Sequence, residues 1–195
     1  MLSSLVLGLG LLLGLATATA ADTGSVSGSV TAAAPKNLPN TLVFVKSGDK
    51  GGKAPKTAKM DQSGLIFVPR VLPIAAGSTV QFSNSDAVGH SVFTLDGEKY
   101  DLGTWKKGET RSYTFTKTGV YRQLCKVHDD MIAYIVVLDT DHYALTDTKG
   151  AFKLEGLPPG DYTLGVWSEK LGSPDIPVHV TAGQAATVTI PLGAK

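Results

Sequence analysis

Short runs of alternating or continuous apolar residues recur along most of the chain, and helical periodicity is hard to find. The runs are rich in Val, Ile, Tyr, Phe and Thr, and Gly, Pro, Asp and Asn separate them, as in strands bounded by turns. Examples are TLVFVK, STVQFSN, HSVFTL, IAYIVVL and DYTLGVW. Short strands spaced by turn residues are typical of sandwiches and barrels, so the pattern predicts an all-β protein.

The N-terminal segment follows a different pattern. Residues 5–18 are almost all Leu, Val, Gly and Ala, no charged side chain precedes Asp22, and ATATAA at 16–21 offers Ala-x-Ala cleavage patterns. These features predict a signal peptide over residues 1–21 and a periplasmic or otherwise exported protein. The alternative is an uncleaved membrane anchor, which needs about 18 or more apolar residues. The observed run is shorter and is interrupted by glycines.

Two polar segments divide the rest of the chain. The segment 46–59 has five lysines, three glycines and a proline, which is typical of an exposed linker. Farther on, the apolar run IAYIVVL gives way to DTDH at 139–142. We therefore expect one domain over residues 56–139. The formal net charge is +1 and no block of like charge dominates, so a nucleic acid is not an expected partner.

The single cysteine of the chain lies in LCKVHDDM, residues 124–131. GVYRQLC is expected to be a strand that ends at Cys125, and MIAYIVVL a strand that begins at Met131, so a short loop between them carries His128. His90 follows the strand STVQFSN on a loop that contains Asp and Gly. All four side chains are therefore expected at strand ends, where they could converge.

His90, Cys125, His128 and Met131 form the donor set of a type-1 copper site, with three strong ligands and a distant axial methionine. Sulfur donors favour copper over magnesium or calcium, and methionine is not a usual zinc ligand. Taken alone, each residue has a structural role as the alternative to metal binding; for Met131 this role is packing in a core. The combination predicts one bound copper ion, and a geometry intermediate between Cu(I) and Cu(II) preferences favours one-electron transfer.

Residues 57–138 resemble a cupredoxin, the blue-copper family of plastocyanin and amicyanin. The motifs F-x-P and G-x-x-V-x-F-x-N precede His90, and T-G-x-Y-x-x-x-C-x-x-H spans Cys125 and His128. The resemblance implies a Greek-key β-sandwich, the same four ligands, and His128 as the exposed electron port. The chain has Ser91 where cupredoxins often have an asparagine that ties the two ligand loops together.

Asp129 and Asp130 stand where related sequences usually have a proline or an aromatic residue before the methionine. An acidic pair beside the electron port predicts a redox partner with a basic surface, such as a c-type cytochrome. A dehydrogenase is another candidate redox partner. If docking is electrostatic, the electron-transfer rate should fall steeply with salt.

The remaining segments resemble a carboxypeptidase-regulatory-like (prealbumin-like) β-sandwich. The motifs T-D-x-x-G-x-F and L-P-P-G-x-Y-T-L lie after residue 145, and GSVSGSVT and LPNTLVFVKS supply the opening strands at the other end of the chain. We therefore expect this domain to be split into residues 24–50 and 141–193 by an inserted cupredoxin domain. The alternative is a tandem in which residues 24–47 extend the cupredoxin sheet. The second domain shows no chemical cluster and is expected to act as a scaffold or in docking.

Three functions remain open: an exported blue-copper electron carrier, a periplasmic copper-delivery or copper-sequestering protein, and a copper-free binding module. The full donor set argues against a copper-free module, and a closed cage suits electron cycling better than delivery. A copper enzyme is not expected, because the only histidines outside the donor set are His142 and His179, in the other domain. We therefore expect an electron carrier with no small-molecule substrate.

Overall fold

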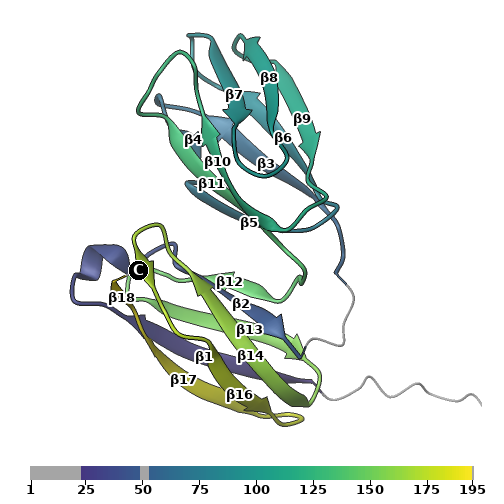
Figure 1. The fold of residues 1–195 in the computed structure, drawn as a ribbon, viewed down its shortest axis with the longest axis vertical. Coiled ribbons are helices and arrows are strands. Elements are labelled where there is room, and N and C mark those ends of the chain that lie inside the picture. The colour runs from purple at the N-terminus through teal and green to yellow at the C-terminus, as the bar shows by residue number, and fades with distance from the viewer. Residues whose placement is uncertain (1–22, 49–52, 195) are drawn as a thin grey trace, which may run out of the picture.

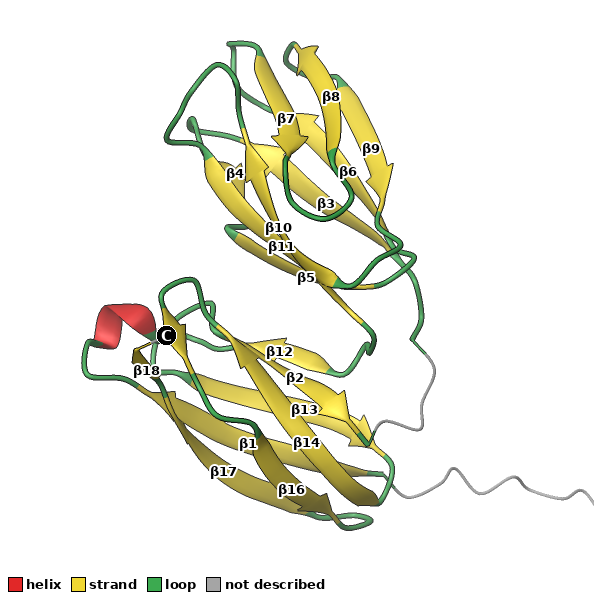
Figure 2. Cartoon of the chain, viewed as in Figure 1, coloured by secondary structure: helices red, strands yellow, loops and turns green. Residues whose placement is uncertain are grey.

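A computed structural model describes residues 23–48 and 53–194, so the predicted signal peptide lies outside the described residues. The fold is all-β, as predicted, and the one helical segment in the described part is the 3-10 helix η1 (Pro35–Asn37). None of the described helical structure is long and apolar enough to cross a membrane. Figures 1 and 2 show two β-sandwiches packed against each other.

The first sandwich, residues 57–138, has one sheet in the order β4-β3-β6-β9 and one in the order β5-β11-β10-β7-β8. The chain passes repeatedly between the sheets, and parallel pairs join β3 to β6 and β5 to β11, in agreement with a Greek-key sandwich. Its strands are β3 (Thr57–Gln62), β4 (Phe67–Val68), β5 (Val71–Ala75), β6 (Thr79–Asn84), β7 (His90–Thr94), β8 (Tyr100–Trp105), β9 (Thr110–Thr114), β10 (Gly119–Leu124) and β11 (Ile132–Leu138).

Alternation along each strand decides which side chains enter the core. In β6, Val80 and Phe82 are buried, whereas their neighbours along the strand are partly exposed. They pack in one apolar cluster with Met60, Phe115 and Ile135. Burying an apolar side chain of this size contributes about 1.5–3 kcal/mol, so this cluster holds the two sheets together.

Strand β11 is buried on both faces over its second half. Ile135 and Val137 pack into the core of the first sandwich, whereas Val136 and Leu138 pack against Leu42 of the second sandwich. This explains why IAYIVVL is continuously apolar instead of alternating.

The second sandwich takes strands from both ends of the chain. Strand β1 pairs with β13 and β17, and β2 pairs with β12 and β14. The pairing supports insertion of the first sandwich into the second rather than a tandem; the limits 24–50, 56–139 and 141–193 stay a prediction. The strands are β1 (Gly24–Thr31), β2 (Leu42–Ser47), β12 (Tyr143–Leu145), β13 (Ala151–Leu157), β14 (Gly160–Trp167), β15 (Leu171–Gly172), β16 (Ile176–Val180), β17 (Ala185–Pro191) and β18 (Gly193–Ala194).

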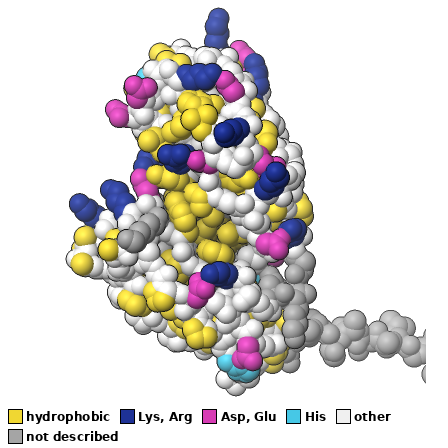
Figure 3. All heavy atoms as spheres, in the orientation of Figure 1, with side chains coloured by type: hydrophobic (Ala, Val, Ile, Leu, Met, Phe, Trp, Pro, Cys, Tyr) yellow, Lys and Arg dark blue, Asp and Glu magenta, His cyan; other side chains and the backbone are white. Residues whose placement is uncertain are grey.

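Polar and aromatic contacts also join the two sandwiches. Arg70 forms an ion pair with Glu169 at 2.8 Å, and the rings of Tyr134 and Trp167 lie 5.1 Å apart between centroids. An apolar groove of about 450 Å³ lies beside this junction, and Figure 3 shows apolar side chains gathered there. Its apolar lining includes Phe44, Val120, Val136, Val166 and Trp167.

Candidate metal centre

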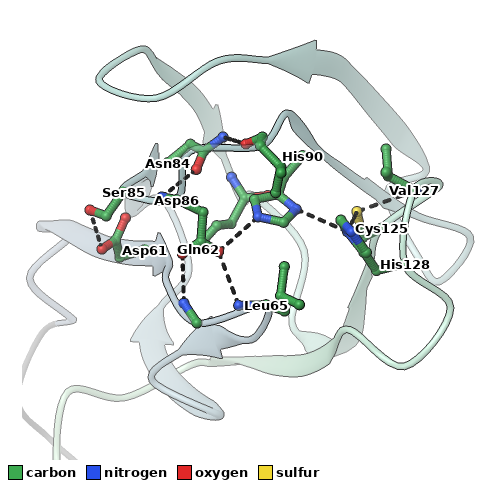
Figure 4. A network of polar contacts seen from close by, with 12 residues as sticks. Asp61, Gln62, Leu65, Asn84, Ser85, Asp86, His90, Cys125, Val127 and His128 are labelled. Atoms are coloured by element: carbon green, nitrogen blue, oxygen red, sulfur yellow. Dashed lines mark hydrogen bonds and ion pairs between the residues drawn. The ribbon is translucent and has the colours of Figure 1, made fainter.

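The predicted strong ligands come from two loops at one end of the first sandwich. His90 is the first residue of β7, Cys125 follows the last residue of β10, and His128 lies in the loop before β11. Because β10 pairs with both β7 and β11, these loops lie next to each other. Figure 4 shows the side chains of His90, Cys125 and His128 turned toward one another.

The donor atoms are close enough to share one ion. His90 Nδ1 lies 3.1 Å from His128 Nδ1, and Cys125 Sγ lies 4.0 Å from His128 Nδ1. The three donor atoms all lie within 4.8 Å of one another. Bonds from nitrogen and sulfur to zinc, an ion of similar size to copper, are about 2.0–2.3 Å, so one ion among these atoms could reach all three.

The donor set fits copper. His90 Nε2 faces a carboxylate, so its proton is expected on Nε2 and the Nδ1 lone pair points toward the other donors. One thiol sulfur and two imidazole nitrogens are the strong ligands of a type-1 copper centre. His90 and Cys125 are buried and His128 is half-buried, so the centre is shielded except on the side of His128.

Met131 lies beside this set. It is 1% exposed and belongs to the same apolar cluster as Cys125. Its backbone N–H donates to the carbonyl oxygen of His128 at 3.1 Å, which closes the turn between the last two predicted ligands. The role of its thioether as the axial ligand stays a prediction.

Ser91 connects the two ligand loops. Its Oγ accepts a hydrogen bond from the backbone N–H of Lys126 at 2.7 Å and lies 3.8 Å from Cys125 Sγ, to which its hydroxyl can donate. The N–H of Val127 also points at this sulfur, at 3.4 Å. Serine thus makes the inter-loop connection that the resemblance assigns to an asparagine at this position.

Asn84 holds the loop that leads to His90. Its side-chain amide donates to the carbonyl oxygens of Val88 at 2.9 Å and Trp105 at 3.1 Å. Its Oδ1 accepts from the N–H of Asp86 at 2.9 Å. Because Asn84 is only 1% exposed, these bonds are shielded from water and restrain the loop.

Asp86 is a partner of the site that the sequence reasoning missed. Its Oδ2 lies 2.9 Å from His90 Nε2. The N–H groups of Leu65 and Gly64 also donate to this carboxylate, at 3.0 and 2.7 Å. Led by the bond from Leu65, these contacts lower the pKa of Asp86 from 3.8 to about 2. The sequence feature that could have indicated this partner is the aspartate four positions before the histidine in NSDAVGH.

The other two histidines lie in the second sandwich. His179 Nδ1 is 2.7 Å from Asp161, in a pair whose side chains are both well exposed. Among residues 23–48 and 53–194, the set formed by His90, Cys125 and His128 is the one group of three or more His, Cys, Asp or Glu side chains placed to hold a metal ion.

Two protein families match the chain. Residues 54–138 match the copper-binding proteins of the plastocyanin/azurin family, and residues 132–193 match the carboxypeptidase regulatory-like domain. The matches overlap at residues 132–138, which correspond to β11, a strand that pairs with β5 and β10 of the first sandwich.

The solved structures with similarity to the chain include cupredoxins and a copper-containing reductase. A purple cupredoxin from Nitrosopumilus maritimus is 21% identical over 42% of this chain and 99% of its own, with a TM-score of 0.39. A reduced Cu(I) form of an amicyanin variant is 25% identical over 49% of this chain and 98% of its own, with a TM-score of 0.40. A copper-containing nitrite reductase from Thermus scotoductus SA-01 is 26% identical over 56% of this chain but only 28% of its own, with a TM-score of 0.40.

The family matches confirm the predicted resemblances: the chain combines a domain similar to the plastocyanin/azurin family of copper-binding proteins with a β-sandwich similar to the carboxypeptidase regulatory-like domain.

Proposed function

We propose that this protein is an exported type-1 copper protein that holds one copper ion and carries single electrons between redox proteins. The supporting observation is the convergence of His90 Nδ1, His128 Nδ1 and Cys125 Sγ within 4.8 Å. When bound, copper supplies a one-electron couple between Cu(I) and Cu(II). The two imidazoles and the thiolate would hold it, with Met131 as the distant fourth ligand.

The surrounding protein restrains these ligands. Ser91 and Asn84 fix the two ligand loops through hydrogen bonds that are largely buried. Donor atoms that are held in one arrangement move little when the copper ion gains or loses an electron. Because little rearrangement is needed, the barrier to electron transfer is low. A restrained, largely buried site therefore suits repeated electron transfer better than copper delivery.

The electron port would be His128, the one half-buried donor. Two exposed apolar side chains belong to this region. Val127, which precedes His128 in the chain, is 50% exposed, and so is Leu65, whose backbone N–H donates to Asp86. Asp129 and Asp130, which follow His128 in the chain, are also exposed. We propose that this face docks a redox protein with a basic rim, such as a c-type cytochrome.

The docking proposal is tested by the ionic-strength dependence of electron transfer to a basic cytochrome. The rate should fall steeply with added salt, and the double variant Asp129→Asn/Asp130→Asn should flatten this dependence. Asp161→Asn, an exposed carboxylate of the second sandwich, is the matched control and should behave like the wild type. A wild-type rate that is indifferent to salt would contradict electrostatic docking.

We do not propose an enzymatic function. The chain has four histidines, and the copper set uses two of them. His142 and His179 lie in the second sandwich, away from the ligand loops. The nitrite reductase among the similar structures matches over 28% of its own length, so its activity is not carried over to this chain.

The copper assignment is tested by adding Cu(II) to the purified apoprotein and recording visible and EPR spectra. We expect an intense blue colour and a narrow copper hyperfine splitting. Cys125→Ser should abolish both, whereas His179→Gln should leave both unchanged. A colourless complex from which copper is readily chelated would contradict the proposal and favour copper delivery.

Export is tested separately by cell fractionation and N-terminal sequencing. The mature chain should be found outside the cytoplasm and begin after residue 21. A cytoplasmic chain that retains residues 1–21 would contradict this part of the proposal.

A further inference from the structure

One carboxylate joins the first copper-site histidine to a turn on another part of the chain. Asp86 Oδ2 lies 2.9 Å from His90 Nε2 and accepts from the N–H of Leu65 at 3.0 Å. Asp86 Oδ1 accepts from the N–H of Gly64 at 2.7 Å. Figure 4 shows Asp86 between His90 and the segment of Leu65. The side chain of Asp86 is 16% exposed.

The turn that faces Asp86 has an unusual backbone. Gly64 has a φ of 70° and Leu65 a φ of 62°, so two successive residues are left-handed. This conformation is unfavourable for leucine, and the Leu65 side chain is 50% exposed, so burial does little to offset it. Successive N–H groups directed at one anion form a nest. The contacts therefore indicate that the Asp86 carboxylate holds the turn in this shape.

We propose that Asp86 is a positioning residue of the copper centre, which strengthens His90 as a copper ligand and at the same time holds the Leu65 turn beside the port. This inference rests on the proposed function. Asp86 is not itself a ligand in this proposal, because His90 lies between it and the other donors.

The physical reason lies in the second nitrogen of the imidazole. A carboxylate that accepts from Nε2–H fixes the tautomer and raises the basicity of the Nδ1 donor. A stronger nitrogen donor stabilises Cu(II) more than Cu(I), so it lowers the reduction potential. Loss of such an outer partner typically costs about 10–100-fold in metal affinity. A tenfold effect on Cu(II) alone corresponds to about 59 mV for a one-electron couple.

The test compares Asp86→Asn with Asp61→Asn in the full copper-loaded chain. Both substitutions remove one negative charge from the same region. The Asp61 carboxylate, however, accepts from Ser83 Oγ and Ser85 Oγ at 2.6 and 2.7 Å rather than from a ligand. We expect Asp86→Asn to raise the reduction potential by about 59 mV or more, and Asp61→Asn to shift it much less. Equal shifts in the two variants, or no shift in Asp86→Asn, would overturn the proposal.

The second part of the proposal has a readout that does not need copper. Asp86→Asn should speed hydrogen exchange of the Gly64 and Leu65 amides in the apoprotein, because a neutral amide accepts these bonds more weakly than a carboxylate. Asp61→Asn should leave both amides as protected as in the wild type. Unchanged exchange in Asp86→Asn would overturn the positioning of the turn.

The wild-type protein supplies a further check if the variant does not fold. Nitrogen-15 NMR of the apoprotein should show His90 protonated on Nε2, and a proton on Nδ1 alone would overturn the inference. A wild-type protein without a type-1 spectrum would refute the proposed function. A blue wild-type protein whose potential does not respond to Asp86→Asn would refute this inference alone.

Discussion

Ser91 Oγ accepts a hydrogen bond from the backbone N–H of Lys126 at 2.7 Å, across 35 residues of sequence. The bond joins the residue that follows His90 to the residue that follows Cys125, so each ligand loop limits the motion of the other. Ser91 is fully buried, and water cannot readily replace this contact. The Ser91 hydroxyl group therefore helps to fix the spacing between two predicted ligands.

Ser91→Ala should destabilise the protein and loosen the copper centre. Leaving the Lys126 N–H without its partner is expected to cost about 1–3 kcal/mol in the free energy of unfolding, and the EPR lines of the copper form should broaden. Ser78→Ala is the matched control, because Ser78 is also buried and accepts from the N–H of Lys56 at 3.0 Å. It should lower stability and leave the EPR spectrum unchanged. Identical spectra for wild type and Ser91→Ala would contradict the role of Ser91.

Met131→Leu should separate the axial role of Met131 from its packing role. Leucine is of similar size, so the free energy of unfolding of the apoprotein should fall by less than about 1.5 kcal/mol. The blue colour should persist because the three strong ligands remain. The reduction potential should rise, because a weak donor to Cu(II) has been removed. An unchanged potential, measured by redox titration, would show that Met131 acts only as a core residue.

Leu42→Ala should uncouple the two sandwiches. Leu42 is fully buried in the junction cluster with Val136 and Leu138, and its truncation is expected to cost about 2–5 kcal/mol. Calorimetry should show one unfolding transition for the wild type and two for the variant. Leu164→Ala, inside the second sandwich, should lower the transition temperature without splitting it. A single transition in Leu42→Ala would mean that the other junction contacts suffice for coupling.

Asp96→Asn should have an effect on stability that depends on pH. The Arg122 guanidinium donates to Asp96 at 2.8 and 2.9 Å, and this contact lowers the pKa of the carboxyl below its ordinary value of 3.8. The folded chain therefore binds this proton less tightly than the unfolded chain. The stabilisation is complete above the unfolded pKa and is lost as the pH falls through the folded pKa.

At neutral pH, Asp96→Asn is expected to cost about 1 kcal/mol, as for a partly exposed ion pair. Urea unfolding of the apoprotein should show the difference from wild type shrinking as the pH is lowered below 3.8. A difference that stays constant with pH would contradict this account.

The sequence predicted the donor types and their places at strand ends, because a thiol, two imidazoles and a thioether with C-x-x-H-x-x-M spacing have few structural alternatives. The structure places His90, Cys125 and His128 together through strand pairing that the apolar runs anticipated. Asp86 had no comparable signal, and the resemblance showed only that Ser91 stands where cupredoxins often have a loop-connecting asparagine. Their partners lie 21 and 35 residues away, and no local pattern shows which backbone N–H a loop side chain will meet.

The sequence also predicted only part of how the chain is divided between the two sandwiches. The motifs indicated that β1 and β2 belong with the C-terminal strands, but only the paired strands show that Ser25 lies opposite Ala185 in a parallel register. The burial of β11 on both faces likewise became clear only when Leu42 was seen against Val136. Local alternation of side chains predicted most of the longer strands, and the turn residues predicted their approximate ends. The tertiary structure decided which loops and faces meet, because those contacts depend on the packing of strands far apart in sequence.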